Sequence, residues 1–393
     1  MAQEEGVLLE KLQGGLARLA DGTDNHVAYI ATGLPVGAVA TAIHAGGKGI
    51  KLTAPYGAEQ IGINESFDAN NNLTLHADIV EFFRLAPEAT LYLFDKTTKA
   101  DLKAFINQNK EIKGYGLNIQ YNSEAPNLVS TMNAHQVIIE EFAAENRLID
   151  FCIVGANNLD VFTQDMFALA CPQVTPLIAC SDPSGVVRVT SALGMIAVRQ
   201  INENMGSVDI IKKPRAKRGS LDYSLTDQKL GVWLAAYLPD GRSVDSLDNS
   251  EYKDIKALGF VMACSYQEYA GVFFQNSYTA IDRNSDFGHI ENNRTWNKAA
   301  RITRATLIPR VKGIVKKDPN TGFIAPTTVG SWSGLLNKAI EKMVTDNEIS
   351  GFETYIEQKQ VVNSTNPVKV KLTIVADGIV HEFDVAVGLT NNI

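Results

Sequence analysis

Residues 74–95, TLHADIVEFFRLAPEATLYLFD, decide the fold class, because a helix pattern leads directly into a strand pattern. In residues 74–86 the apolar side chains recur at helical spacing, which predicts an amphipathic helix. Residues 89–95 form a short apolar run that predicts a buried strand. HVAYIAT (26–32) predicts a second buried strand earlier in the chain. The order strand, helix, strand indicates a βαβ unit and a largely parallel sheet.

This alternation of helices and apolar strands continues as far as Ser181. The segments that continue it are KADLKAFINQ (99–108), AHQVIIEEFAAENR (134–147), DFCIVGA (150–156), VFTQDMFALA (161–170) and TPLIACS (175–181). SALGMIAVRQINENMG (191–206) predicts a helix that ends at a glycine, and residues 259–281 predict two strands joined by a turn. The sequence therefore predicts an α/β, multidomain protein whose βαβ-containing body holds a mixed sheet.

Four regions are predicted along the chain. They are an N-terminal arm and linker (1–25), an α/β domain (26–190), a middle region that completes the body (191–285) and a C-terminal domain (286–393). The last boundary follows from the polar break DRNSDFGHIENN (282–293).

The chain end VKLTIVADGIVHEFDVAV (370–387) predicts a β-hairpin arm. Asp377-Gly378 is the dipeptide favoured by a two-residue type I′ turn, in which both residues have positive φ. This turn would place Leu372 opposite Phe383 and Val370 opposite Val385, so that both strands keep one apolar face. A two-stranded hairpin is only marginally stable in water, and it must therefore join its own sheet or the sheet of another subunit.

The other chain end has a second short apolar segment, GVLLEKL (6–12), which includes Val7, Leu8 and Leu9. Gly14 and Gly15 follow it, and glycine frees the backbone. We therefore expect a detachable β-arm on a flexible linker.

Composition restricts the class of partner. The 393-residue chain has a formal net charge of −8, which argues against general attraction to nucleic acid or to an anionic membrane. It shows no signal peptide and no apolar run long enough to span a bilayer. The four cysteines lie in apolar runs without a C-x-x-C pair, which predicts buried, reduced thiols in an intracellular protein.

The motifs of catalysis and cofactor binding are incomplete. AGGKGIKLT (45–53) lacks the first glycine and the final Ser or Thr of a phosphate loop. GSWSG (330–334) resembles a nucleophile elbow but has Trp332 where the serine should be. The six histidines form no i, i+4 pair, and no acidic cluster matches a calcium loop. We therefore predict no catalytic, cofactor or metal site, and no enzyme activity.

Two segments are strongly basic. KKPRAKRGS (212–220) predicts a solvated loop, with a phosphate-binding patch as the alternative. RTWNKAARITRATLIPRVKGIVKK (294–317) holds eight basic residues and no acidic one. A helical projection places Arg294, Lys298 and Arg301 on one side with Arg304 at its flank. Because acidic i, i+4 partners are missing, this face favours a charged partner outside the chain, although a merely solvated face is the alternative.

The C-terminal third resembles the sheath proteins of contractile phage tails and related contractile injection systems. The resemblance rests on a basic helix (292–315), a Gly/Pro/Thr loop (318–330), a second helix (331–344), a linker that opens on Gly351 and the final hairpin. Earlier segments are also similar to the family, namely HVAYIATGLPVGAV (26–39), YGAEQIG (56–62), LHADIVEFFRLAPEATLYLF (75–94) and ALGMIAVRQINENMGSVD (192–209). Residues 207–256 match no part of the family pattern.

The resemblance implies a structural subunit that polymerises as rings or helical layers around an inner tube and contracts to drive the tube through a target envelope. The implied partners are the chain itself, the inner tube protein, and baseplate and tail-terminator proteins. It implies a virion tail or injection particle assembled in the bacterial cytoplasm. The implied tube-facing residues are Arg294, Lys298, Arg301 and Arg304, and the implied intersubunit strands include Val7, Leu8, Leu9, Val370, Leu372, Ile374, Phe383 and Val385.

Two other functions remain open from the sequence. The first is an α/β enzyme that binds a nucleotide or acyl substrate, although the glycine fingerprint of a dinucleotide site is absent. The second is another virion component, such as a tail-terminator or baseplate protein.

Overall fold

The structure is a computed structural model that describes residues 24–31, 33–95, 98–119, 127–156, 163–363 and 367–381. The chain divides into two compact units, Met1–Asn297 (unit 1) and Lys298–Ile393 (unit 2). Val7, Leu8, Leu9, Gly14 and Gly15 lie outside the described residues, and the N-terminal arm stays a prediction.

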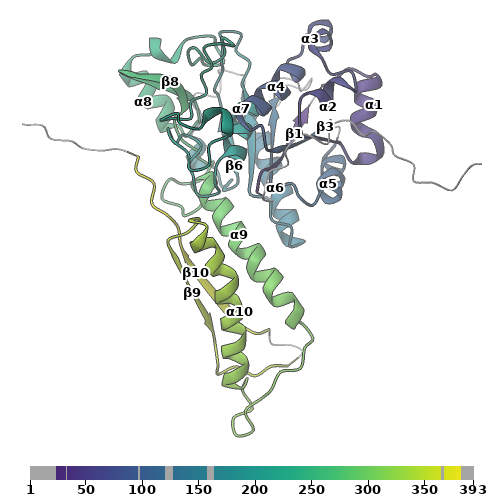
Figure 1. The fold of residues 1–393 in the computed structure, drawn as a ribbon, viewed down its shortest axis with the longest axis vertical. Coiled ribbons are helices and arrows are strands. Elements are labelled where there is room, and N and C mark those ends of the chain that lie inside the picture. Colours follow the sequence, from purple (N-terminus) through teal and green to yellow (C-terminus); the bar gives the residue numbers. More distant parts are fainter. Residues whose placement is uncertain are drawn as a thin grey trace, which may run out of the picture. The chain divides into compact units, whose positions relative to one another are not determined.

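Unit 1 contains a six-stranded mixed sheet with the strand order β2-β3-β1-β4-β5-β6, of which β1, β3 and β6 are labelled in Figure 1. The strands are β1 (His26–Ala31), β2 (Ile50–Leu52), β3 (Thr90–Asp95), β4 (Gly114–Asn118), β5 (Phe151–Gly155) and β6 (Val174–Leu177). Edge strand β2 is antiparallel to β3, and the other pairs are parallel. The predicted α/β class and the mixed sheet are confirmed.

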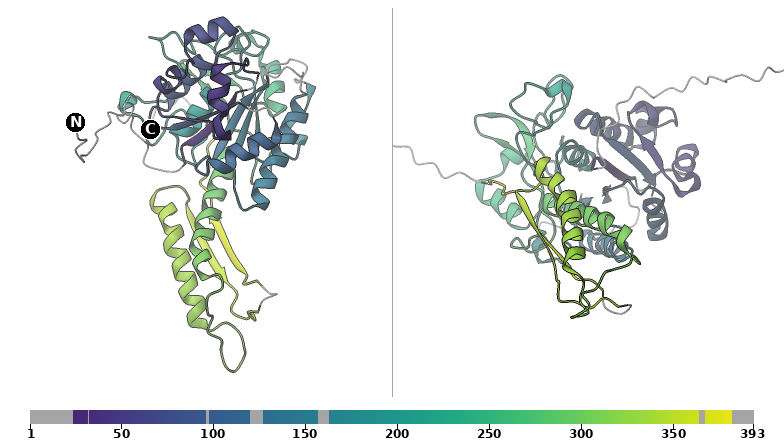
Figure 2. Two further views of the ribbon diagram at one scale, coloured as in Figure 1. Left: turned by 90° about the vertical axis from the view of Figure 1, so that its right-hand side faces the viewer. Right: turned by 60° about the horizontal axis from the view of Figure 1, so that its bottom comes forward.

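Helices cover both faces of this sheet (Figure 2). The helices that lie wholly within unit 1 are α1 (Ala38–His44), α2 (Tyr56–Glu59), α3 (Glu65–Asn71), α4 (Leu75–Leu85), α5 (Lys99–Gln108), α6 (Leu128–Ala144), α7 (Val189–Val198) and α8 (Asn249–Ala257), of which α8 lies beside β8 and away from this sheet. Neighbouring residues of β4 show the two faces, because successive strand residues point in opposite directions. The Tyr115 hydroxyl is 3.0 Å from His135 Nδ1 of α6, whereas Gly116 lies against Val189 and Leu193 of α7.

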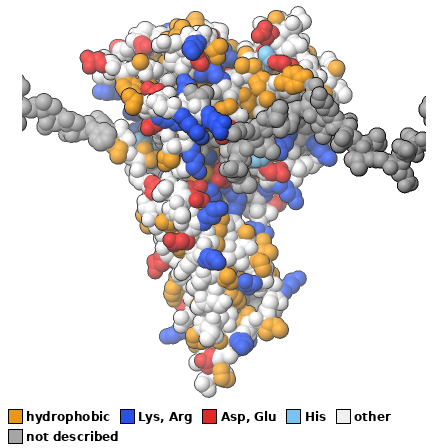
Figure 3. Space-filling view, in the orientation of Figure 1, with side chains coloured by type: hydrophobic (Ala, Val, Ile, Leu, Met, Phe, Trp, Pro, Cys, Tyr) orange, Lys and Arg blue, Asp and Glu red, His pale blue; other side chains and the backbone are white. Residues whose placement is uncertain are grey.

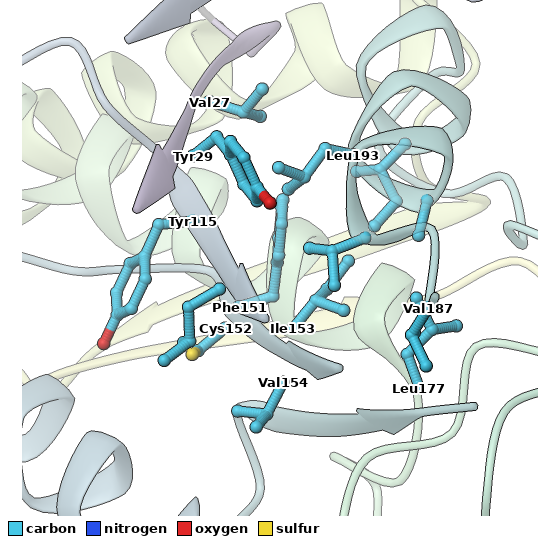
Figure 4. Close-up of a cluster of buried hydrophobic side chains, with 14 of the residues drawn as sticks. Val27, Tyr29, Tyr115, Phe151, Cys152, Ile153, Val154, Leu177, Val187 and Leu193 are labelled. Atoms are coloured by element: carbon cyan, nitrogen blue, oxygen red, sulfur yellow. The ribbon is translucent and has the colours of Figure 1, made fainter. Parts of the chain in front are cut away.

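The strands in the core of unit 1 do not alternate between apolar and polar residues, because both of their faces are covered. All residues of β3, β4 and β5 are buried, as expected for parallel strands that are covered on both faces. Figure 4 shows Tyr115, Phe151 and Ile153 within this core, and Leu193 of α7 nearby.

The middle region, which the sequence could not place, is anchored to α4 and α7. Trp233 is fully buried, and its indole Nε1 donates to Glu81 Oε1 at 3.0 Å. Ser191 Oγ of α7 donates to the same carboxylate oxygen at 2.9 Å. The Tyr223 hydroxyl donates to the carbonyl of Leu85 at the end of α4. Residues 207–256 are therefore part of unit 1 and not a separate module.

Two predicted elements differ in detail and a third is confirmed. In place of a helix over 161–170, the described residues hold a single 3-10 turn, Met166–Ala168. The helix predicted over 191–206 ends at Val198, because Arg199 has extended backbone angles and its buried guanidinium donates to the carbonyls of Met195 and Ser207. The two strands predicted in 259–281 are confirmed as the hairpin of β7 (Ala263–Tyr266) and β8 (Tyr269–Phe274).

The C-terminal region consists of two long helices and two short strands. They are α9 (Ile290–Leu307), α10 (Pro326–Thr345), β9 (Gly351–Ile356) and β10 (Val370–Val375). The first residues of α9 belong to unit 1 and the remainder to unit 2. The linker predicted to open on Gly351 is wrong, since GFETYI is strand β9. Its aromatic and β-branched residues favour a strand.

Candidate functional site: a subunit-contact surface

Unit 2 is built on α10, which begins with Pro326 in its first turn. Its buried residues are Val329, Leu336, Ile340 and Met343, whose spacing of seven, four and three places them on one helix face. Val329 and Leu336 form a small core with Ile324 and with Ile356 of β9. This face of α10 is therefore used for internal packing.

Strands β9 and β10 form a two-stranded antiparallel sheet beside α10 (Figure 1). Val370 lies opposite Ile356 and Leu372 lies opposite Thr354. Along β10 the half-buried residues Val370, Leu372 and Ile374 alternate with exposed ones. The period-2 pattern predicted for this strand is thus present, with one half-buried face and one open face.

The partner of β10 differs from the predicted one. Among the described residues β10 pairs with β9, and residues 376–381 form no strand. Neither Asp377 nor Gly378 has the positive φ of a type I′ turn, so the predicted turn is not formed in this structure. Instead, the Ser350 hydroxyl donates to the Asp377 carboxylate. Phe383 and Val385 lie outside the described residues, and their role stays a prediction.

This small sheet leaves strand edges open. In the part of the chain that the structure describes, β9 and β10 each pair with one strand only. An unpaired edge presents N–H and C=O groups that can hydrogen-bond to an added strand. Tyr355 and Val375 expose about half of their surface, 52% and 56%. The sheet can therefore accept a strand from another chain by β-augmentation.

The predicted tube-facing helix requires a correction at Arg294. This residue is only 2% exposed, and its Nη1 donates to the carbonyl of Gln200 at 3.1 Å. Burial lowers its pKa, and the carboxylate of Glu291 lies within its electrostatic range. Arg294 thus packs inside unit 1 and cannot meet a partner. The helical projection failed because it assumed that the polar face of this helix is exposed. Instead Asn297 is buried and donates to Asp150 Oδ1 at 2.9 Å, whereas Trp296 is 47% exposed.

The other three residues of the predicted basic face belong to unit 2. Lys298 Nζ is 2.5 Å from Glu348 Oε1, so the acidic partner that α9 lacks comes from the residues after α10. Arg301 is half-buried and Arg304 is exposed. The structure therefore does not present these three as one exposed stripe.

The exposed basic residues lie further along the same segment. After α9, Arg310, Lys312, Lys316 and Lys317 are all exposed. Ile308, Val311 and Ile314 alternate with them and are at least half exposed. Hydrophobic and basic side chains occur side by side on the surface of unit 2 in Figure 3. We call residues 308–317 the basic segment; its mixture of cations and aliphatic side chains suits an acidic protein surface better than water alone.

The strand ends of unit 1 test the enzyme alternative. In open α/β sheets, ligands bind beyond the carboxyl ends of the strands where the strand order reverses. Here Asn118 at the end of β4 donates to the carbonyl of Val187 at 2.9 Å. A Cβ on Gly116 or on Gly155 would lie 2.6 Å from Val189. The chain itself therefore packs against β4 and β5 here, and the glycines allow α7 to approach closely. The strand order reverses between β1 and β4, and residues 32 and 120–126, which follow these two strands, lie outside the described residues.

A buried ionic network near this edge escaped the sequence analysis. Asp78 Oδ2 accepts hydrogen bonds from Tyr29 at 3.2 Å and Thr74 at 3.1 Å, and its Oδ1 is 3.4 Å from Arg188 Nη1. Burial raises the pKa of Asp78 to about 6. Arg188 also pairs with Asp182 at 2.9 Å. The network links α4 to the chain before α7. The only signal for it in the sequence is that Asp78 falls on the apolar face of the predicted helix.

The described residues contain no group of His, Cys, Asp and Glu side chains that could hold a metal ion. No described helix is both long and apolar enough to cross a membrane. All four cysteines are buried, free thiols.

Residues 286–393 match the family model described as DUF2586, C-terminal domain. No curated protein matches the sequence. The structural similarity extends over nearly the whole chain. A chain of the anti-feeding prophage (AFP) baseplate, from a cryo-EM structure with 6-fold symmetry applied, is 11% identical, with a TM-score of 0.58 and 100% of both chains covered.

A second solved structure with this similarity is the sheath tail protein of Listeria innocua, which is 10% identical. Its TM-score is 0.51, and the match covers 91% of this chain and 96% of the Listeria protein. The chain therefore has the fold of contractile sheath tail proteins, and the resemblance seen in the sequence extends to the structure.

Proposed function

We propose that this chain is a structural subunit of a contractile tail or injection particle, and that it forms a sheath around an inner tube. The observation that carries the proposal is the similarity of fold over nearly full length to a sheath tail protein and to a chain of a 6-fold baseplate. The open edges of the β9–β10 sheet support it, because a polymer needs contacts that repeat from copy to copy.

Neighbouring subunits would be joined through strands at the chain ends. Residues 6–12 of one copy and residues 376–393 of another would add to the edges of β9 and β10, including the backbone at Val370, Leu372 and Ile374. Main-chain hydrogen bonds would hold the copies together, and the linker predicted from the sequence at Gly14 and Gly15 would let them move. Contraction could then be driven by a small gain in the apolar surface buried between subunits. Burying ~200 Å² more per subunit would stabilise the contracted state by ~5 kcal/mol.

The inner tube would meet the basic segment of unit 2 together with Arg301 and Arg304. Arg301 and Arg304 are kept from the predicted face, and the basic segment takes the place of Arg294, which is buried, and of Lys298, which pairs with Glu348. An acidic tube surface would complement them. Because exposed ion pairs contribute ~0.2–1 kcal/mol each, the contact depends on repetition along the sheath.

Two other functions are a baseplate role and an enzyme role. A baseplate role is the second candidate, and the similarity to the AFP baseplate chain favours it. An enzyme role is disfavoured, because the sequence lacks the glycine fingerprint of a dinucleotide site and its other catalytic motifs are incomplete. We therefore propose that the chain has no catalytic activity and needs no cofactor.

Negative-stain microscopy of the purified protein, after size-exclusion chromatography, tests the proposal. A sheath subunit is expected to form tubes or stacked rings at high concentration. A baseplate subunit is expected to give single rings that do not stack. A monodisperse monomer or dimer at every concentration, or a bound dinucleotide, would contradict both structural roles.

A further inference from the structure

The basic loop of the middle region, residues 212–218, lies outside the surfaces discussed so far. Its base is fixed by the chain on either side, since Ile210 and Tyr223 are buried and the Tyr223 N–H donates to the carbonyl of Val208 at 2.6 Å. Lys213 closes the loop by pairing with Asp209 at 2.6 Å and by donating to the carbonyl of Ser220. The loop is thus held in one conformation and is not a loose solvated tail.

The other cations of the loop are largely accessible. Lys212, Arg215 and Arg218 are exposed, and Lys217 is half-buried within electrostatic range of Asp227. Two aliphatic side chains flank the loop, Ile211 at 62% and Leu221 at 87% exposure. Exposed aliphatic groups beside fixed charges are the composition of a protein contact.

We propose that this basic loop docks on an acidic surface of a second copy of the chain. The inference rests on the proposed homo-oligomer and adds a contact to it that uses no terminal strand. The loop carries five of the basic residues of a chain whose net charge is −8, so the rest of the molecule is more acidic than that value indicates. The excess of acidic side chains over the rest of a neighbouring copy would supply the complementary charge, and a head-to-tail contact of this kind repeats in a ring or helix.

Charge reversal of the loop tests this contact in the full-length protein. The variant Lys212→Glu, Arg215→Glu and Arg218→Glu is expected to raise the concentration needed for assembly roughly tenfold or more at low salt, because attraction becomes repulsion. Sedimentation at low and high salt measures the effect. High salt should weaken assembly of the wild type and narrow its difference from the variant, because screening suppresses both attraction and repulsion. The neutral variant with glutamine at the same three positions should shift assembly in the same direction by less.

The matched control reverses three exposed lysines elsewhere in unit 1, as Lys48→Glu, Lys110→Glu and Lys253→Glu. It changes the net charge equally, and its assembly should shift by less than about threefold. A second pair of changes, Ile211→Ser and Leu221→Ser, should weaken assembly without altering its salt dependence.

Each outcome decides between explanations. If the loop reversal and the control assemble alike, the proposed contact is wrong while the sheath function stands. If the reversal assembles normally but loses retention of a double-stranded DNA fragment, the loop binds nucleic acid and the proposal is overturned. If the wild type forms no assembly at all, the proposed function itself fails.

Discussion

Unit 1 and unit 2 differ in how their strands are covered. Every residue of β3 in unit 1 is buried, whereas β10 in unit 2 alternates between half-buried and exposed residues. Unit 1 has a six-stranded sheet whose inner strands pair on both sides, together with the β7–β8 hairpin, whereas unit 2 has only a two-stranded sheet among its described residues. Two strands alone are marginally stable, but packing against a helix supports them. The large sheet of unit 1 is therefore covered by its own chain, while the exposed edges of the small sheet in unit 2 are left to water or to an added strand.

This difference shows how one chain can combine a stable body with an adaptable contact region. The body needs the close packing that Gly116 and Gly155 permit beneath α7. The contact region needs unpaired edges and exposed side chains, which would destabilise a core. The predictions below test whether the two units divide these tasks.

Removal of residues 376–393 should have the largest effect, on assembly and not on folding. The deletion leaves β9, β10 and α10 intact and removes the side-chain contact from Ser350 to Asp377. We expect a soluble protein with both units folded that no longer forms tubes or rings, because the strand supplied to a neighbour is lost. Microscopy and circular dichroism measure the two properties. Normal tubes from the shortened chain would disprove strand exchange at this end.

Substitutions in the two cores should separate the stabilities of the units. Phe105 is fully buried and stacks on Phe94 with ring centroids 4.4 Å apart, so Phe105→Ala should lower the free energy of unfolding of unit 1 by about 3–5 kcal/mol. Leu336→Ala should lower that of unit 2 by about 2–3 kcal/mol. Calorimetry should show two transitions, each moved by its own substitution. A single transition moved by both would mean that the units unfold together.

Arg294 separates a buried role from a surface role on one helix. Arg294→Glu places a carboxylate near Glu291 and Asp150, and we expect it to destabilise unit 1 by about 3–5 kcal/mol. Arg294→Gln, which keeps a polar group without charge, should cost less. Denaturant unfolding monitored by circular dichroism measures both. If Arg294→Glu unfolds with the same free energy as the wild type, Arg294 lies on the surface and not inside unit 1.

Much of the architecture of unit 1 could be predicted because its strands are continuous apolar runs. Residues 89–95 and 150–156 predicted β3 and β5 to within a residue. Strand β4, GYGLN, was missed because two glycines lower its strand propensity, although Gly116 is required for the approach of α7. The sequence predicts a linker in place of strand β9, because β9 is only partly buried and therefore shows no apolar run. Its pairing partner β10 also begins 14 residues after β9 ends.

The contact surface was harder to predict, because it depends on which polar residues are buried. The charge pattern of residues 294–317 was visible, but hydropathy cannot show that Asn297 and Arg294 face inward and Trp296 outward. That arrangement depends on partners distant in sequence, such as Asp150 and Gln200. The exposed cations of the basic segment follow Pro309, where the helical projection no longer applies.

Asp78 should give unit 1 a pH dependence that unit 2 does not share. Its pKa is raised from 3.8 to about 6, so the folded state binds the proton more tightly than the unfolded chain. Stability from this group is therefore fully present below pH 4 and falls as the pH rises through 6. The loss amounts to about 2–3 kcal/mol, at 1.36 kcal/mol for each pKa unit.

The comparison with Asp78→Asn isolates this titration. Asp182 changes in the opposite sense, because burial raises its pKa but hydrogen bonds from Ser184 and Arg188 bring it to about 2, and its contribution is lost only in strong acid. Between pH 4 and pH 7 the wild type should therefore lose stability relative to Asp78→Asn. A constant difference over this range would show that Asp78 titrates normally.

The smallest effect on stability is expected at Arg310 in the basic segment of unit 2. Its side chain is exposed, so Arg310→Glu should change the free energy of unfolding by no more than about 0.5 kcal/mol. The same change should nevertheless weaken sheath formation around an acidic tube, since one weak contact is lost in every subunit. Cosedimentation with the tube at low and high salt measures this. Lys338→Glu, at an exposed position of α10, is the control, because it changes the net charge by the same amount. If Arg310→Glu binds the tube as the control does, the basic segment is only solvated. If instead Arg310→Glu destabilises unit 2, the segment supports the fold, and the division of tasks between the two units is wrong at this position.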